Sequence, residues 1–358
     1  MKKVALLLSG CLVMYCATCR PPTSRHFKMQ QQPSLTIDVN EGIELLSVIQ
    51  YLGGQLSNST PSVYKTALKK YFLPYRSHAA VTTMFLFDNT IYPDMVEWGI
   101  LFYNYPDIKM RAMPDSSSWY KYIPKDVLHQ YFLQCIQFYK DTKFHAFYAS
   151  HHNEYAAWAA SLKTEISEPI KIFNQYFNQD KKYSWTICLD PLNDWGAHTI
   201  IPSTITNTLP NCIIYQLGYM GDVDSAKQMV FKTDVYDIAW HEGTHAVTDN
   251  ILKAYKTSID SLSPLLKTDD ALKKQNITDW QHYFNELIAR SVSIALHKKY
   301  RSNADYERLL QFETGRGFIH AKDVSDIIYD EFINERKYQY FEDVLPDVFK
   351  ELKSKYNN

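Results

Sequence analysis

The chain of 358 residues has little cysteine, and three of its six cysteines lie within the first 19 residues. The other three, Cys135, Cys188 and Cys212, are too few for a disulfide-built scaffold or for a zinc cluster held by thiolates. Any bound metal must therefore be held by His, Glu or Asp. Cys188 and Cys212 fall in neighbouring predicted strands, so a disulfide between them and three small buried thiols are equally weighted alternatives.

The sequence also lacks an excess of either charge, because 38 Lys and Arg residues stand against 39 Asp and Glu residues. Loss of Lys2 and Lys3 with the first segment would leave 36 against 39, a net charge of about −3. Such a chain has no field of one sign with which to attract nucleic acid, so no nucleic-acid partner is expected. Hydrophobic residues make up 46% of the chain, which is enough for a substantial core and argues against disorder.

Only the start of the chain has a long apolar run, and nothing after it is long and apolar enough to span a bilayer. The segment MKKVALLLSGCLVMYCATC, residues 1–19, places two lysines before apolar residues, which is typical of an export signal. The stretch LSGC, ending at Cys11, is similar to a lipoprotein box, whereas Cys19 suits the usual signal length better. We expect export to a bacterial cell envelope or secretion, with membrane contact only through a lipid anchor.

The remainder of the sequence predicts an α+β fold that is mainly α, with a small β-sheet. Residues 20–37 are a polar tether, residues 38–180 an N-terminal helical region, and residues 181–358 a second region that contains the sheet. Helical periodicity covers residues 41–54, 62–76, 125–141 and 154–179, with Pro169 expected to bend or divide the last helix. Short β-branched and aromatic runs at 183–191, 198–202 and 211–221 indicate the strands.

The stretch AWHEGTHAVTDN, residues 239–250, carries the pattern most closely tied to chemistry. A spacing of four residues places His241 and His245 on one face of a helix, one turn apart, where both can bind a metal. Glu242 is offset by about 100° from His241 and lies where a general base belongs. Gly243 is a poor residue inside a helix, so we expect something to pack closely against it. Asp249 is a candidate hydrogen-bond partner for His245.

A third metal ligand must come from another segment, because a catalytic zinc site uses three protein ligands and leaves a fourth position to water. Glu286 lies in DWQHYFNELIARSVSIALHKKY, residues 279–300, an apolar helix for which Asp279 is the predicted N-cap. Its alternative role is an ion pair with Arg290, four residues later. His282 and His297 on the same helix are weaker ligand candidates.

These residues resemble a known family. HEGTH followed by NELIAR looks like the gluzincin clan of zinc metallopeptidases. IELLSVIQYLGG, the exported start and ERKYQYFEDVLPDVF resemble a group of exported bacterial zincin-like proteins, over most of residues 38–352. The resemblance implies a zincin-like catalytic region at 181–358, with Zn²⁺ held by His241, His245 and Glu286 and with Glu242 as the base. It also implies that NCIIYQLG, residues 211–218, lies along the bound peptide. Two departures stand out: the step from His245 to Glu286 is longer than in the clan's aminopeptidases, and no glutamate matches their amine-binding motif.

The sequence therefore predicts a zinc metallopeptidase that hydrolyses peptide bonds in a peptide or protein substrate. A donor for the oxyanion is also expected, for which His320 in GRGFIHAKD and Tyr338 in ERKYQY are the candidates. The alternative is an exported surface lipoprotein that acts as a binding module, with a structural or vestigial zinc site.

Overall fold

The computed structural model describes residues 34–54, 56, 62–84, 87, 96–103, 108–110, 123–177, 183–193, 196–200, 212–218 and 234–355. The described residues belong to one compact unit, so the predicted boundary near residue 180 separates two regions of a single unit. The predicted export signal and both candidate lipidation cysteines, Cys11 and Cys19, lie outside the described residues. None of the described helices combines the length and the apolar character that a membrane crossing requires.

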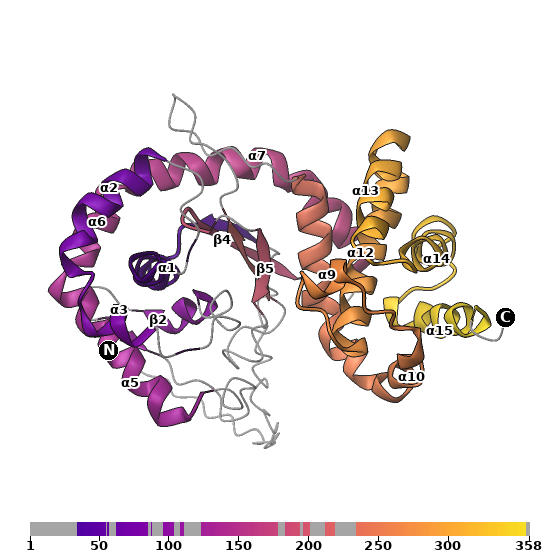
Figure 1. Cartoon of the computed structure of the whole chain (residues 1–358). Coiled ribbons are helices and arrows are strands. Elements are labelled where there is room, and N and C mark those ends of the chain that lie inside the picture. Colours follow the sequence, from indigo (N-terminus) through magenta and orange to yellow (C-terminus); the bar gives the residue numbers. More distant parts are fainter. Residues whose placement is uncertain are drawn as a thin grey trace, which may run out of the picture. The chain divides into compact units, whose positions relative to one another are not determined.

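A mixed four-stranded sheet lies in the order β1-β4-β6-β5 (Figure 1). β1 (Leu35–Asp38) and β6 (Cys212–Gly218) both run parallel to β4 (Ser184–Asp190), whereas β5 (Ala197–Ile200) runs antiparallel to β6. The three strands after residue 180 confirm the predicted sheet. β1 was not predicted, because four alternating residues give too weak a pattern without their partner strand, and it begins in the last residues of the segment 20–37 expected to be a tether.

The N-terminal region is mainly helical, as the sequence predicted. α1 (Glu41–Gly53) begins where the Asn40 side chain accepts hydrogen bonds from two backbone N–H groups, and it ends at Gly54 with φ 77°. The other elements before the sheet are α2 (Val63–Phe72), η1 (Leu73–Tyr75), α3 (Ala79–Met84), η2 (Val96–Leu101), β2 (Phe102–Tyr103), β3 (Lys109–Met110), α5 (Lys125–Asp141), α6 (Phe144–Ser150) and α7 (His152–Phe177). β2 and β3 form a second, two-stranded sheet.

Of the two outcomes predicted for Pro169, a bend or a division, division does not occur, because α7 continues through the proline. Ile166, Ile170 and Phe173 are buried on one face of this helix, on both sides of the proline. Their burial against the core stabilises a helix that has lost one backbone hydrogen bond. The Pro169 carbonyl also accepts a hydrogen bond of 3.0 Å from the Trp240 indole, which ties α7 to the next long helix of the fold.

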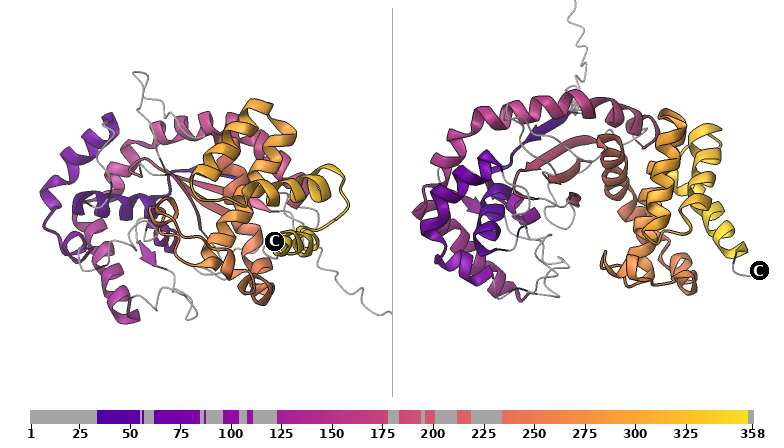
Figure 2. Two further views of the ribbon diagram at one scale, coloured as in Figure 1. Left: turned by 45° about the vertical axis from the view of Figure 1, so that its right-hand side comes forward. Right: turned by 45° about the horizontal axis from the view of Figure 1, so that its top comes forward.

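Two long helices form the centre of the C-terminal region. α9 (Val235–Ala254) and α12 (Trp280–Tyr300) pack against each other, and α9 also contacts α7 and strand β5 (Figure 2). The other C-terminal elements are α10 (Lys256–Asp260), η4 (Ser263–Leu265), α11 (Asp270–Lys273), α13 (Asn303–Gly315), α14 (Ala321–Ile327), η5 (Ile328–Asn334), η6 (Phe341–Val344) and α15 (Leu345–Ser354). The architecture is mainly α with a small mixed sheet, which confirms the predicted fold class.

The three described cysteines are free thiols, so the disulfide between Cys188 and Cys212 is not formed. The register of β4 and β6 gives the reason: Cys212 lies opposite Ser184, and Cys188 lies opposite Gln216. Four residues of strand separate the two sulfur positions by roughly 13 Å at about 3.3 Å per residue, well beyond disulfide reach. The buried-thiol alternative describes Cys135 and Cys188, and Cys212 is partly exposed.

Candidate metal site

Helix α9 presents the H-E-x-x-H residues in the predicted way. It begins where the Asp234 side chain accepts a hydrogen bond from the Tyr236 N–H, and it runs without a break through the motif. The Nε2 atoms of His241 and His245 are 3.0 Å apart. Their side chains are 17% and 12% exposed, so both lie within the protein with only an edge open.

Gly243 allows this helix to approach the sheet closely. A Cβ atom at this position would lie 2.6 Å from Cη2 of Trp185 in β4 and 3.1 Å from Cζ of Phe173 in α7. Real Cβ atoms essentially never lie within 3.0 Å of another heavy atom, so a side chain here would force α9 or the Trp185 ring to move. The close packing expected from this glycine is therefore present, and it fixes the depth at which the two histidines lie.

Glu286 of α12 joins the two histidines to complete a three-residue cluster. Its Oε1 lies 3.3 Å from His245 Nε2, and its Oε2 lies 3.7 Å from His241 Nε2. Tetrahedral zinc with bonds of about 2.1 Å separates neighbouring ligand atoms by roughly 3.4 Å. The three distances lie on both sides of this value, so the cluster has the spacing and the chemistry of a zinc site. It is the one group of three metal-ligating side chains found among the described residues.

Arg290 pairs with Glu286 as well, so the ion pair considered for Glu286 is present, and the same carboxylate lies beside both histidines. The Arg290 guanidinium donates to Glu286 over 2.6 Å and to Glu313 of α13 over 2.7 Å. Burial alone would raise the pKa of Glu286, but Arg290 and the two histidines hold it well below its usual range. The carboxylate is therefore ionised, which is the form a metal requires.

The two histidines have opposite pKa shifts. Burial, together with the charge of His245, lowers the pKa of His241 well below its usual value, so this imidazole is neutral and can offer a lone pair. Burial also acts on His245, but Glu286 outweighs it and raises the pKa of this histidine. Glu286 is thus the dominant electrostatic partner of His245.

Glu242 is buried beside the cluster, with 6% of its surface exposed. The Thr199 hydroxyl of β5 contacts both the Glu242 carboxylate, at 2.5 Å from Oε2, and the Glu242 backbone carbonyl, at 2.9 Å. Burial raises the pKa of Glu242, and the nearby His245 and Thr199 partly offset this rise. A carboxyl group with a raised pKa that opens onto a cavity is suited to accept and return a proton.

The cluster opens into a cavity of about 630 Å³. His241, Glu242, His245 and Glu286 form one side of it. The remaining lining comes from β5, from the segment 274–277, from His282, Asn285 and Arg290 of α12, and from Arg316. This volume lies within the range of roughly 300–1,000 Å³ that is common for ligand-binding sites.

Two predicted site residues are not brought to this cavity. Tyr338 lies in the segment before α15, and its hydroxyl donates a hydrogen bond of 2.7 Å to Asp347 in the first turn of that helix. His320 precedes α14 and packs edge-on against Tyr283. Neither residue lines the cavity, so neither can donate to an oxyanion there. Their sequence neighbourhoods held no periodic pattern that would place them, and these two assignments are corrected.

The weaker predictions around the motif have mixed outcomes. His297 is buried, and its ring contacts the Ser293 carbonyl oxygen and the Trp240 indole, so it is a core histidine. His282 lines the cavity from the first turn of α12 but lies outside the three-residue cluster. Asp249 accepts a hydrogen bond from Lys253 over 2.6 Å and makes no described bond to His245.

The strand expected to lie along a bound peptide is not available for that role. β6 is paired on both sides, with β4 and with β5, so its backbone groups are already used. β5 is the last strand in the described part of this sheet, and its residues Ala197, His198 and Thr199 line the cavity. The correction follows from strand order, which the sequence of short β-runs does not reveal.

Three residues of this region were missed by sequence reasoning. Thr199 holds the Glu242 carboxylate, Glu313 is the second partner of Arg290, and Arg316 lines the cavity with 35% of its side chain exposed. Arg316 stands between two glycines, Gly315 and Gly317, and that local pattern was its only signal. Thr199 and Glu313 carried none, because their partners are far away in the sequence.

Comparisons with known proteins add a family match but no activity. Residues 117–351 match the model of a family described as a domain of unknown function (DUF4932). The match spans α9, α12 and all three members of the cluster. No curated protein and no solved structure matches the chain.

Proposed function

Since the chain belongs to the DUF4932 family, to which no activity is attached, we propose its function from the site itself: a zinc-dependent peptidase of gluzincin type. The observation that carries this proposal is the convergence of His241, His245 and Glu286, with ligand atoms 3.0–3.7 Å apart, beside the buried Glu242. A structural zinc site would need a fourth protein ligand, and none is present among the described residues near this cluster.

Each site residue would have a separate task in peptide hydrolysis. Bound zinc would polarise the scissile carbonyl and make water a better nucleophile at neutral pH. Glu242 would take the proton from the attacking water and pass it to the leaving amine. Its raised pKa brings proton uptake closer to neutral pH, and Thr199 holds its carboxylate in place.

Arg316 is the best-placed donor for the negative charge that develops on the carbonyl oxygen. Arg316 lines the cavity, and it pairs at 3.7 Å with Glu313, which also accepts a hydrogen bond from Arg290. A cation in a partly enclosed cavity stabilises such charge more strongly than one in open water. Arg316 therefore takes the role that sequence reasoning gave to His320 and Tyr338.

The substrate backbone would lie against β5. This strand ends the described sheet at the cavity, and Thr199 connects it to Glu242. An extended peptide can pair with an edge strand through backbone hydrogen bonds, independently of its own sequence. The predicted export signal at residues 1–19 would place this activity in the cell envelope or outside the cell.

The test combines metal content with loss of one carboxylate. The mature chain should bind one zinc ion, and Glu242→Gln should keep both the fold and the zinc while lowering kcat by about 10²- to 10⁴-fold on a peptide library. A chelator-treated sample and His241→Ala are the controls for metal dependence. Failure to bind zinc would remove the proposal. Zinc binding without cleavage of any peptide would favour the binding-module alternative.

A further inference from the structure

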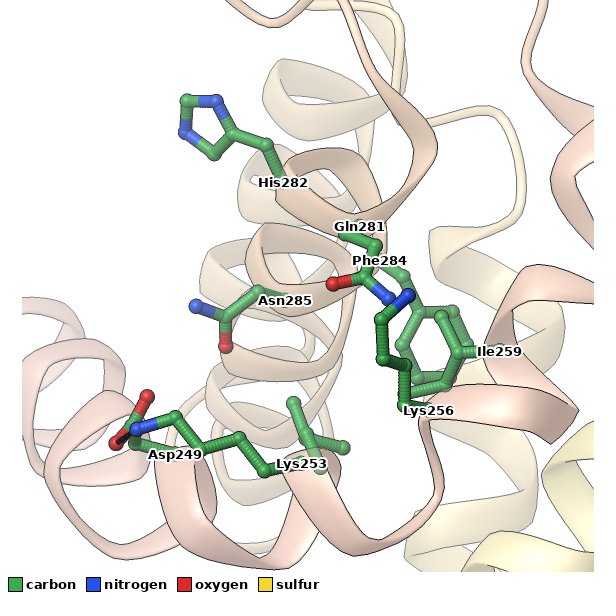
Figure 3. A pocket seen from close by; sticks show the side chains of 9 residues that line it. Asp249, Lys253, Lys256, Ile259, Gln281, His282, Phe284 and Asn285 are labelled. Carbon is green, nitrogen blue, oxygen red and sulfur yellow. Dashed lines mark hydrogen bonds and ion pairs between the residues drawn. The ribbon is translucent and has the colours of Figure 1, made fainter. Parts of the chain in front are cut away.

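A second cavity of about 360 Å³ shares lining residues with the metal-site cavity. Figure 3 shows the side chains that line this second cavity. The two cavities share His282 and Asn285 of α12 as lining residues. Asp249, Leu252 and Lys253 of α9 line the second cavity as well. It therefore continues along the same pair of helices that present the metal ligands.

The position of this cavity relative to the metal ligands follows from helix geometry. Asp249 is four residues after His245 on α9, and His282 is four residues before Glu286 on α12, so both lie about one turn beyond the ligands. One turn advances about 5.4 Å, whereas an extended peptide advances about 3.3 Å per residue. A side chain one or two residues from a peptide bond at the metal site would reach the second cavity.

The inner surface of the second cavity is apolar. Leu252, Ile259 and Phe284 contribute to it from α9, α10 and α12, and each is buried in the core. Figure 3 shows the Phe284 ring and Ile259 behind the Lys256 side chain. The aliphatic stem of a lysine can cover apolar surface while its charged end stays in water.

The charges at the rim are already neutralised. Lys253 pairs with Asp249, and Lys256 pairs with Asp260, each at 2.6 Å. An acidic ligand would have to compete with these carboxylates, and a basic ligand would meet the two lysines. At the junction of the cavities, the buried Asn285 Oδ1 has no hydrogen-bond partner in the described chain.

We infer that this cavity is a specificity subsite, which receives a bulky apolar side chain of the peptide one or two residues from the cleaved bond. The inference rests on the proposed peptidase function. Burial of a Leu or Phe side chain contributes roughly 1.5–3 kcal/mol, which corresponds to about a tenfold to hundredfold preference over a small side chain.

The first experiment identifies which residue of the substrate enters the second cavity and which side chain is preferred there. A peptide library digested by the wild-type protein gives the preferred sequence, and peptides with Phe, Ala, Asp or Lys at each position near the cleaved bond are then compared by kcat/KM. One position should favour Phe over Ala by about tenfold or more, with Asp and Lys no better than Ala. Preference for Asp or Lys at that position, or no preference at all, overturns the subsite.

Two variants then locate the subsite. Gln281→Trp places a large ring at the exposed rim, and it should lower the ratio of kcat/KM for the Phe and Ala peptides to about one. Gln137→Trp is its control, because Gln137 is also exposed and also donates to an aspartate. Leu252→Ala should widen the preference towards larger rings, with Leu309→Ala as the matched control. If both cavity variants keep the side-chain preference of the wild-type protein, the pocket has no role in specificity.

A binding measurement separates this inference from the proposed function. Calorimetry of the Phe and Ala peptides on the Glu242→Gln protein reports side-chain recognition without turnover. Tighter binding of the Phe peptide, lost in the Glu242→Gln, Gln281→Trp double variant, supports the subsite. Wild-type cleavage with equal binding of both peptides overturns only the subsite. No cleavage together with no binding overturns both proposals.

Discussion

Two clusters of buried polar side chains in the described part of the chain differ in their geometry, and one of them brings metal-ligating atoms together beside a cavity. The first lies between α1 and the sheet and contains Glu44, Tyr64, Tyr155 and Asp190. The Tyr64 hydroxyl donates to Glu44 and contacts the Tyr155 hydroxyl at 2.7 Å, and Ser47 donates to Asp190 over 2.7 Å. The second is the cluster of α9 and α12 described above.

The pKa of a buried carboxyl group is shifted in opposite directions in the two clusters. Burial, with a further contribution from the charge of Asp190, raises the pKa of Glu44 to about 8. In the other cluster, Arg290 and the histidines keep the pKa of Glu286 well below its usual range against the same effect of burial. Glu44 is therefore largely protonated at neutral pH, and Glu286 is ionised.

This comparison shows that a perturbed pKa does not identify a functional site by itself. Neither of the two cavities is lined by Glu44 or Asp190. The α9–α12 cluster differs because three metal-ligating atoms converge at its centre and because a cavity gives a substrate access to them. Convergence and access are the properties that the following predictions test, in order of decreasing effect.

The largest effect is expected at Glu44, on stability. Its pKa of about 8 in the folded protein exceeds the ordinary value of 4.5, so the stability it contributes is present below pH 4.5 and is lost as pH rises through 8. This difference in pKa corresponds to about 5 kcal/mol. Glu44→Gln should flatten the dependence of unfolding free energy on pH between 4.5 and 8. Urea titrations at several pH values measure it, with exposed Glu165→Gln as the control. An unchanged pH profile would show that Glu44 is ionised in the folded protein.

At Arg290, the expected effects fall on both stability and metal affinity. Arg290→Met would leave Glu286 and Glu313 without their shared cation, at a cost of about 3–5 kcal/mol. Zinc affinity should also fall by roughly tenfold to a hundredfold, because the ligand carboxylate loses its orienting partner. Urea unfolding and competition with a chelator measure the two effects. Arg308→Met, which breaks an exposed pair with Asp305, should change neither. Retention of full zinc affinity would contradict the role given to Arg290.

A smaller effect is expected at Gly243, where α9 meets the sheet. Gly243→Ala should destabilise the protein by about 1–3 kcal/mol, because the new methyl group overlaps Trp185 and Phe173. Thermal unfolding of the apo protein measures this. Gly315→Ala is the control, since nothing lies near its Cβ position, and there alanine should stabilise slightly. A Gly243→Ala protein as stable as the wild type would mean that α9 can shift away from the sheet.

The smallest effect is expected at Thr199 and concerns catalysis alone. Thr199→Val removes the hydroxyl that contacts Glu242 but keeps the shape of the side chain, and kcat should fall by about tenfold. Because this hydrogen bond lowers the pKa of Glu242, the acid limb of the kcat–pH profile should also move to higher pH. Thr248→Val is the control, since its hydroxyl bonds a helix carbonyl away from the cavity. A profile that does not move would limit Thr199 to a structural role.

Local patterns in the sequence were sufficient to predict α1, α9 and α12, because each is marked by helical periodicity and a side-chain cap or a glycine stop. Periodicity alone was sufficient for α5. The same patterns placed His241, Glu242 and His245 relative to one another, since four residues along a helix have only one arrangement. The sequence around Glu286 gave weaker evidence for its predicted role as the third metal ligand. Its identification depended on an apolar helix that contained a carboxylate.

Tertiary structure alone decided the remaining features. Strand order made β5 the edge strand and separated Cys188 from Cys212, and chain packing brought Thr199, Glu313 and Arg316 to the site while leaving His320 and Tyr338 elsewhere. The physical reason is the range of the interactions. Helical periodicity and capping act within a few residues, whereas register and side-chain contacts between distant segments depend on how whole elements pack.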